Sequence, residues 1–165
     1  MSTNASTSLN NRNSLVRSIV LGGVIIGTLH LIIQDFFVFS LLDNTPFISV
    51  LQYMASGALG NAAFAGGLAT ALLGVLFHAL VCFAVASIFI LSADRIPLLR
   101  RNVVVGSLLY GIGVFIVMNF IVLPLSAAPR LPPPEPSQLI ELIIEHALVA
   151  GLPLGLLIRR NAMGR

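Results

Sequence analysis

Four long apolar segments dominate this 165-residue sequence and restrict the folds that are open to it. They are predicted to run from about Ser18 to Phe37, within Ala62–Leu91, from about Val103 to Leu123, and from Leu139 to Ile158. Each supplies the roughly 20 residues that a helix needs to cross about 30 Å of bilayer. Because lipid offers the backbone no hydrogen-bond partner, runs of this length must be helical. The sequence therefore predicts an all-α membrane protein, a bundle of four transmembrane helices.

The composition supports this class. Hydrophobic residues make up 57% of the chain and charged residues only 9%, whereas soluble domains carry about 25% charged residues. Such a chain cannot cover a globular surface with polar groups, so its main partner should be the lipid bilayer. The net charge of +3 comes from arginines that flank the apolar segments. That is the pattern of topology signals, so no nucleic-acid partner is predicted.

The arginines also predict the orientation. Eight of them fall on one side of a four-span chain: Arg12, Arg17, Arg95, Arg100, Arg101, Arg159, Arg160 and Arg165. Only Arg130 falls on the other side. By the positive-inside rule, both termini should be cytoplasmic.

Three regions follow from this topology. Residues 1–17 are rich in Ser, Thr and Asn and are predicted to be a disordered cytoplasmic tail. Residues 18–160 form the four-span domain, and residues 161–165 are a short cytoplasmic tail. The segment from Asp43 to Gly60 predicts a short helix at the outer interface, with a re-entrant segment as the alternative.

Small residues mark the expected contact faces of the helices. At 100° per residue, Gly23 and Gly27 share a face with His30 and Gln34 in the first span. Glycine on such a face lets another helix approach closely. The predicted packing glycines are Gly23, Gly27, Gly67, Gly74, Gly151 and Gly155.

Polar residues recur at neighbouring depths of these spans and form a predicted polar layer, with the three histidines and Glu145 at one level and Gln34, Asn119 and Glu141 one turn further out. Its members are His30, Gln34, His78, Asn119, Glu141, Glu145 and His146. All three histidines should lie roughly 18 to 20 Å from the cytoplasmic ends of their helices. Ionisable groups in a spanning helix cost several kcal/mol unless they are paired or wetted. We therefore expect Glu145 to lie within hydrogen-bond or one-water reach of His30 or His78.

Further expectations concern single residues of this region. We expect His78 to be the central member, because its glycine-lined face admits the closest neighbours. His146 lies about 100° round the helix from Glu145, so we expect it to face a neighbouring helix. Asp35 should lie near the outer headgroups and be solvated.

Three interpretations of the polar layer remain open. It is a satisfied internal hydrogen-bond network, a proton or ion pathway, or a metal or b-type haem site. The candidate ligands for the last are His30, His78, His146 and Glu145. No sequence motif calls for a cofactor, and no GxSxG or phosphate-loop pattern indicates a catalytic residue.

Two classes of function are therefore predicted, and neither requires an enzyme. One is a small transport or proton- and ion-handling protein, which would work as a homo-oligomer because four helices enclose little space alone. The other is a non-catalytic membrane subunit, or an assembly and stability factor, that docks a partner membrane protein through its glycine faces.

The second half of the chain carries a resemblance to a known family. From Leu76 to Arg160, His78 lies in a helix that is followed by a basic loop at Arg95–Arg101 and by FIVLPLSAAPRLPPP. A helix with Glu145-His146 then closes on Ile158-Arg159-Arg160. This stretch resembles the YagU-type family of bacterial inner-membrane proteins. The resemblance implies a multi-pass protein of the bacterial inner membrane and supplies no activity.

Overall fold

The computed structural model describes residues 3–93, 95–132 and 134–163, and all the regular structure among them is helical. Residues 1–2 of the predicted amino-terminal tail and residues 164–165 of the predicted carboxy-terminal tail lie outside this range. The α-helices are α1 (Thr3–His30), α2 (Phe47–Leu59), α3 (Gly67–Ser92), α4 (Pro97–Arg101), α5 (Val103–Val117), α6 (Leu123–Leu125), α7 (Pro136–Glu145) and α8 (Leu152–Met163). Between them lie the π-helices η1 (Leu31–Leu42), η3 (Met118–Val122) and η4 (His146–Gly151), and the 3₁₀-helix η2 (Gly60–Ala65).

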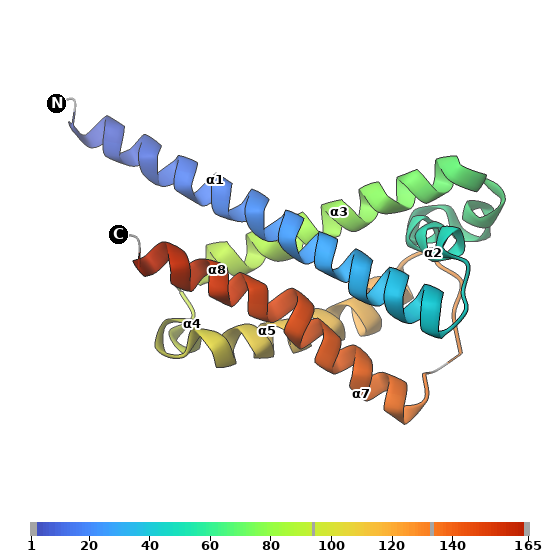
Figure 1. The fold of residues 1–165 in the computed structure, drawn as a ribbon. Helices are drawn as coiled ribbons and strands as arrows, with labels where there is room; N and C mark the ends of the chain where they lie inside the picture. The colour runs from blue at the N-terminus through green and yellow to red at the C-terminus, as the bar shows by residue number, and fades with distance from the viewer. Residues whose placement is uncertain (1–2, 94, 133, 164–165) are drawn as a thin grey trace.

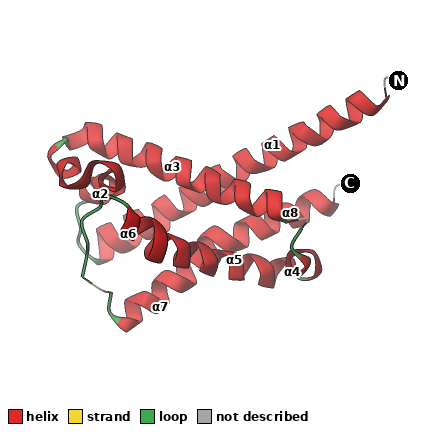
Figure 2. Ribbon diagram, turned by 180° about the vertical axis from the view of Figure 1, so that it is seen from behind, coloured by secondary structure: helices red, strands yellow, loops and turns green. Residues whose placement is uncertain are grey.

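These elements join into four continuous helices long and apolar enough to cross a membrane, which confirms the predicted bundle. They span Asn13–Leu42, Gly67–Ser92, Val103–Leu125 and Pro136–Arg160. Figure 1 shows both termini and α4 at the same end of the bundle, which we call the arginine end. The opposite end, which carries α2 and the proline-rich connection, is called the loop end (Figures 1 and 2).

The amino-terminal segment differs from the prediction. A disordered tail was expected over residues 1–17, whereas α1 begins at Thr3 and continues into the first span. The physical reason is that extending an existing helix avoids the cost of nucleation, since each added residue brings one hydrogen bond. The apolar span provides that existing helix.

The short helix predicted between the first two spans is present as α2. Figure 1 views α2 nearly along its axis, whereas the four spans run across the picture, so α2 lies crosswise at the loop end. This direction agrees with the predicted interfacial helix, since a re-entrant segment would run along the spans. The buried side chain of Gln52 fastens α2 to the start of α3 by donating to the carbonyl of Gly67 at 3.0 Å.

Local signals fix where two of the spans begin. Asn102 is the N-cap of α5, and its side chain accepts a hydrogen bond from the main-chain N–H of Val105. Glu135 and Gln138 form a reciprocal capping box at α7, with Pro136 in the first turn. Each cap satisfies main-chain donors that a helix start leaves free.

Most of the predicted glycine seams are confirmed. A Cβ added at Gly23 would collide with the ring of Phe83 in α3. A Cβ added at Gly151 or at Gly155 would likewise collide with Ser107 of α5. Gly74 is also tightly packed, although its neighbour is the carbonyl of Leu51 in α2 instead of another span.

Two of the predicted glycines behave differently. Gly27 is in ordinary van der Waals contact, because an added Cβ would lie 3.4 Å from the Cβ of Cys82. Gly67 meets nothing within 4 Å and is therefore not a packing residue. Its φ of +56° shows that it serves the turn into α3, since this conformation is costly for any residue with a Cβ.

An apolar core closes the arginine end of the bundle. It consists of Ile26, Cys82, Ala86, Phe89, Ala93, Leu99 and Leu154. The ring of Tyr110 packs 4.8 Å from that of Phe89, and its hydroxyl donates to the carbonyl of Val85 at 2.7 Å. Because this half is well packed, polar side chains gather where the core ends, nearer the loop end.

Candidate functional site

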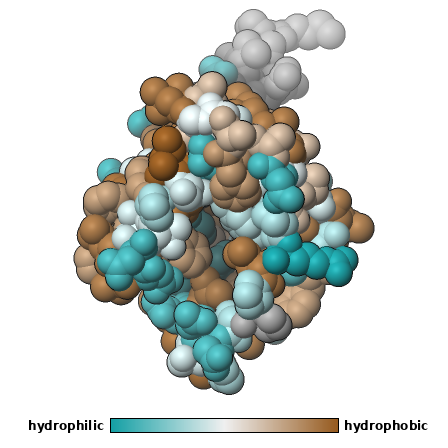
Figure 3. Space-filling view, turned by 90° about the vertical axis from the view of Figure 1, so that its right-hand side faces the viewer, coloured by the Kyte–Doolittle hydropathy of each residue, from teal (hydrophilic) through white to brown (hydrophobic). Residues whose placement is uncertain are grey.

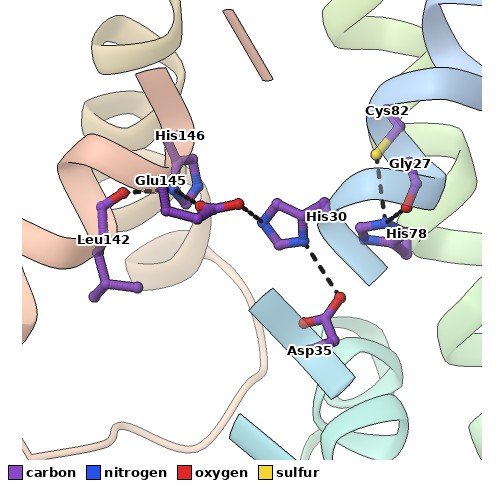
Figure 4. A network of polar contacts seen from close by, with 8 residues as sticks. All are labelled: Gly27, His30, Asp35, His78, Cys82, Leu142, Glu145 and His146. Atoms are coloured by element: carbon purple, nitrogen blue, oxygen red, sulfur yellow. Dashed lines mark hydrogen bonds and ion pairs between the residues drawn. The ribbon is translucent and has the colours of Figure 1, made fainter. Parts of the chain in front are cut away.

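Three of the four spans bring ionisable side chains together inside the bundle, as Figure 4 shows. His30 is the last residue of α1, and Asp35 follows in η1. Glu145 ends α7 and His146 begins η4, so both lie where the fourth span changes from α- to π-helix. His78 lies in the middle of α3. We call these five residues the His/Glu cluster.

His30 is the central member of the cluster, in place of the predicted His78. Its Nδ1 lies 3.3 Å from Asp35 Oδ2, and its Nε2 lies 3.9 Å from Glu145 Oε1. Its ring centroid lies 5.2 Å from that of His78 and 5.4 Å from that of His146. The expected reach between Glu145 and His30 is thus confirmed.

His78 stands at the edge because its hydrogen bonding is used locally. Its Nε2 donates to the carbonyl of Gly27 at 3.1 Å, and the sulfur of Cys82 lies 3.5 Å from the same nitrogen. The looser packing at Gly27 leaves room for this imidazole, so the bond joins the first two spans. The role of His78 is therefore largely to hold α3 against α1.

Asp35 is a member that the sequence prediction placed wrongly, in the solvated headgroup region. It is only 3% exposed and faces His30. In an α-helix, residues five apart point about 140° away from each other. Because η1 is a π-helix with i→i+5 hydrogen bonding, residues 30 and 35 lie on the same face instead. The only sequence signal for this contact was the i, i+5 spacing of His30 and Asp35. That spacing indicates a shared helix face only if the π-helix is already known.

His146 faces a neighbouring helix, as predicted, and also reaches the cluster. Its ring makes an edge contact with Phe115 of α5 at 5.4 Å. Its Nδ1 donates to the main-chain carbonyl of Leu142 at 2.9 Å, which fixes the orientation of the ring. The same bond leaves Nε2 as the nitrogen with the free lone pair.

The carboxylate of Glu145 lacks the hydrogen bonds that burial normally demands. Its side chain is 6% exposed, and neither oxygen has a hydrogen-bond partner among the described residues. Oε2 lies 2.8 Å from His146 Nδ1, but the N–H of that nitrogen is directed at Leu142. A buried carboxylate without hydrogen bonds is costly, and Glu145 is the member of the cluster whose polar atoms lack hydrogen bonds in the described structure.

An open cavity of about 590 Å³ runs along the bundle, from Val38 and Ser137 near the loop end to Glu145 and Val149. It lies between the first and fourth spans, with apolar walls and three polar groups of the predicted layer, Gln34, Glu141 and Glu145. Ser137 and Glu141, near the start of α7, are exposed at its rim. In Figure 3, which faces the loop end, the surface is hollowed near its centre.

Three predicted members of the polar layer lie outside the cluster. Gln34 is 2% exposed, and neither its amide oxygen nor its nitrogen has a partner in the described structure. Glu141 is exposed one turn from Glu145. Asn119 donates to the carbonyl of Phe115 in its own helix at 3.0 Å, so it does not join the helices. These three residues are the ones predicted to lie one turn further out than the histidines and Glu145.

The cluster has donor atoms suited to a metal ion. One ligand atom from each of His30, Glu145 and His146 lies within 4.8 Å of the others. The same holds for His30, Asp35 and His78. Neutral imidazole and carboxylate are common ligands of zinc and related metals. All four predicted metal candidates therefore lie in the cluster, with Asp35 as an addition.

Comparison with other proteins adds no family or function to this geometry. The chain matches no protein-family model, no curated protein and no solved structure. The resemblance to the YagU-type family therefore stays a prediction. On its own structure, the chain is an all-α membrane protein with four spans and a buried His/Glu cluster.

Proposed function

We propose that this protein carries small cations across a membrane and that Glu145 binds them in transit. The proposal rests on the buried carboxylate of Glu145, whose two oxygens lack hydrogen bonds in the described structure. A charge in such a place costs several kcal/mol unless an opposite charge meets it. Ionisable residues inside membrane spans commonly mark ion and substrate routes for this reason.

In this proposal the two halves of the bundle have different roles. The cavity reaches Glu145 from the loop end. On the other side, the apolar core around Phe89 and Leu154 leaves both of these side chains fully buried. A cation would thus reach Glu145 from the loop end and leave after the arginine end opens, as in alternating access.

The arginines give this route a direction. Arg17, Arg95 and Arg159 are exposed near the arginine end of the spans. The positive-inside rule favours this end in the cytoplasm, so the cavity would open to the outside. Together with the family resemblance, this supports a place in the bacterial inner membrane.

A transport assay tests the proposal. The full chain would be reconstituted in liposomes, with uptake followed by dyes for protons, for monovalent cations and for divalent cations. We expect uptake of one class of cation, and we expect Glu145→Gln to abolish it because the amide carries no charge. Glu141→Gln is the comparison on the same helix: Glu141 is exposed at the rim of the cavity, so its neutralisation should at most slow uptake, whereas Glu145→Gln should abolish it. Equal uptake by Glu145→Gln and wild type would refute the proposal.

The other functions considered have less support. The glycine faces at Gly23, Gly74 and Gly151 contact the chain's own helices, so a partner protein would have to use another surface. A haem needs space for its macrocycle between helices. The rings of His30 and His78 instead lie 5.2 Å apart, and none of the three histidines lines the cavity. An ion fits this arrangement better.

A further inference from the structure

The donor atoms around Glu145 point to one class of cation. Hard ions such as Mg²⁺ and Ca²⁺ take oxygen ligands, six or more in the case of Ca²⁺. The groups that surround Glu145 are imidazoles, which suit zinc and its neighbours in the transition series. Glu145 adds one carboxylate, and two histidines with one carboxylate form a common zinc ligand set.

We infer that His30, Glu145 and His146 form a binding site for a divalent transition-metal cation such as Zn²⁺. This inference rests on the proposed cation transport and names its substrate class. The three ligand atoms lie within 4.8 Å of one another. Ligand atoms of a tetrahedral zinc site lie about 3.3 Å apart, given Zn–N bonds of about 2.0 to 2.1 Å. Small side-chain movements toward the ion would therefore complete the site.

The surroundings of the two histidines match those of metal ligands. A histidine that binds a metal through one ring nitrogen usually donates the N–H of the other to a carboxylate or a main-chain carbonyl. That hydrogen bond fixes its tautomer. His30 has Asp35 at 3.3 Å from Nδ1, which leaves Nε2 on the side of Glu145. His146 donates Nδ1–H to Leu142.

The alternative ligand group of His30, Asp35 and His78 is less suitable. Asp35 already faces Nδ1 of His30, and His78 uses Nε2 for the carbonyl of Gly27. Glu145, by contrast, has both oxygens free of hydrogen bonds in the described structure, and the cavity reaches it. Three protein ligands also leave a fourth position open, which suits an ion that must be released.

Metal titration of the purified full chain in detergent tests this assignment. Zn²⁺ binding would be measured by calorimetry, and Co²⁺ would be added as a visible-absorption probe of tetrahedral coordination. We expect one ion per chain. Glu145→Gln and His30→Gln should each abolish tight binding, while thermal unfolding shows that the variants are folded. Asp35→Asn should keep the stoichiometry and weaken affinity by about 10- to 100-fold, as expected for a positioning residue.

Two controls separate this site from its alternatives. Glu141→Gln removes an exposed carboxylate from the same helix and should leave Zn²⁺ affinity unchanged. His78→Asn should also bind Zn²⁺, because His78 lies outside the proposed ligand set. The assignment is overturned if Glu145→Gln and His30→Gln bind like wild type, or if His78→Asn alone abolishes binding.

The metal site and the transport function can fail separately. If the wild type binds no Zn²⁺ but still moves protons or monovalent cations through Glu145, the metal inference is wrong and the proposed transport stands. If Zn²⁺ binds as assigned but no cation crosses the liposome membrane, the metal site stands and the transport proposal is wrong.

Discussion

At the scale of single residues, the cluster is a place where binding and stability oppose each other. Glu145 is buried without hydrogen bonds, and Gln34 is buried nearby in the same state. Each unsatisfied buried group costs about 1 to 3 kcal/mol, and a charged one costs more. A cation at Glu145 would recover part of this cost. Without one, the carboxylate should destabilise the protein.

A stability measurement checks this opposition. In the presence of a chelator, Glu145→Gln should stabilise the protein by on the order of 1 to 3 kcal/mol, because it removes a buried charge and keeps the shape. Thermal unfolding in detergent would measure the effect. Glu141→Gln should change stability by less than about 0.5 kcal/mol, as exposed substitutions usually do. A lower unfolding temperature for Glu145→Gln would show that the carboxylate is satisfied.

At the scale of elements, the π-helices decide which residues meet. η1 aligns His30 with Asp35, whereas an α-helix would align His30 with Gln34. The fourth span likewise changes from α7 to η4 between Glu145 and His146. π-helical turns are rare and often lie at functional sites. Their position beside the cluster fits that association.

Exchanging two neighbouring residues tests the register of η1. The double variant Gln34→Asp, Asp35→Gln keeps the composition and moves the carboxylate by one position. In a π-helix the new carboxylate should no longer face His30, so Zn²⁺ affinity should fall by about 10- to 100-fold. Calorimetry would measure the affinity. Wild-type affinity in the double variant would mean that a carboxylate at position 35 is not needed to orient His30.

The contact between α2 and α3 allows a second test at this scale. A side chain at Gly74 would collide with the main chain of Leu51, which cannot move as a flexible side chain can. Gly74→Leu should therefore destabilise the protein by about 1 to 3 kcal/mol through overpacking. Gly113 is the control, since an added Cβ there meets nothing within 4 Å. Gly113→Ala should be neutral or stabilising by up to about 1 kcal/mol, and equal unfolding temperatures for the two variants would contradict the contact.

At the scale of the whole molecule, the bundle has a packed half and a half with a cavity. Both termini lie at the packed arginine end, and α2 lies across the loop end (Figure 1). The His/Glu cluster stands between the two halves. This arrangement supports the proposed transport, because the site of a carrier must open to one side at a time.

Reporter fusions check the orientation. A reporter joined after Arg165 should be active in the cytoplasm, and one inserted in the loop 132–136 should be active on the outer side. The reason is the eight-to-one division of arginines between the two faces. A cytoplasmic signal from the loop reporter, or an external signal from the terminal one, would contradict the four-span topology.

The sequence by itself determined the four spans, the presence of a short helix between the first two of them and most of the glycine contacts. These features follow from hydrophobic length and helical period, which are local properties of the chain. Depth counting also brought His30 and Glu145 to the same level, because rise per residue is nearly constant in a helix. The helical start of residues 3–17 was missed, since composition does not show that a span can extend its helix.

Only the tertiary structure decided which polar residues meet. Asp35 enters the cluster because η1 changes the angular register, and no periodicity at 100° per residue reports that change. His30 replaced His78 at the centre because the carbonyl of Gly27 takes the hydrogen bond of His78. Glu141 and Glu145 line the same cavity, yet Glu141 is exposed near the start of α7 and Glu145 is buried one turn further along, beside His30 and His146. Contacts across a bundle depend on where several helices lie at once, which no single segment encodes.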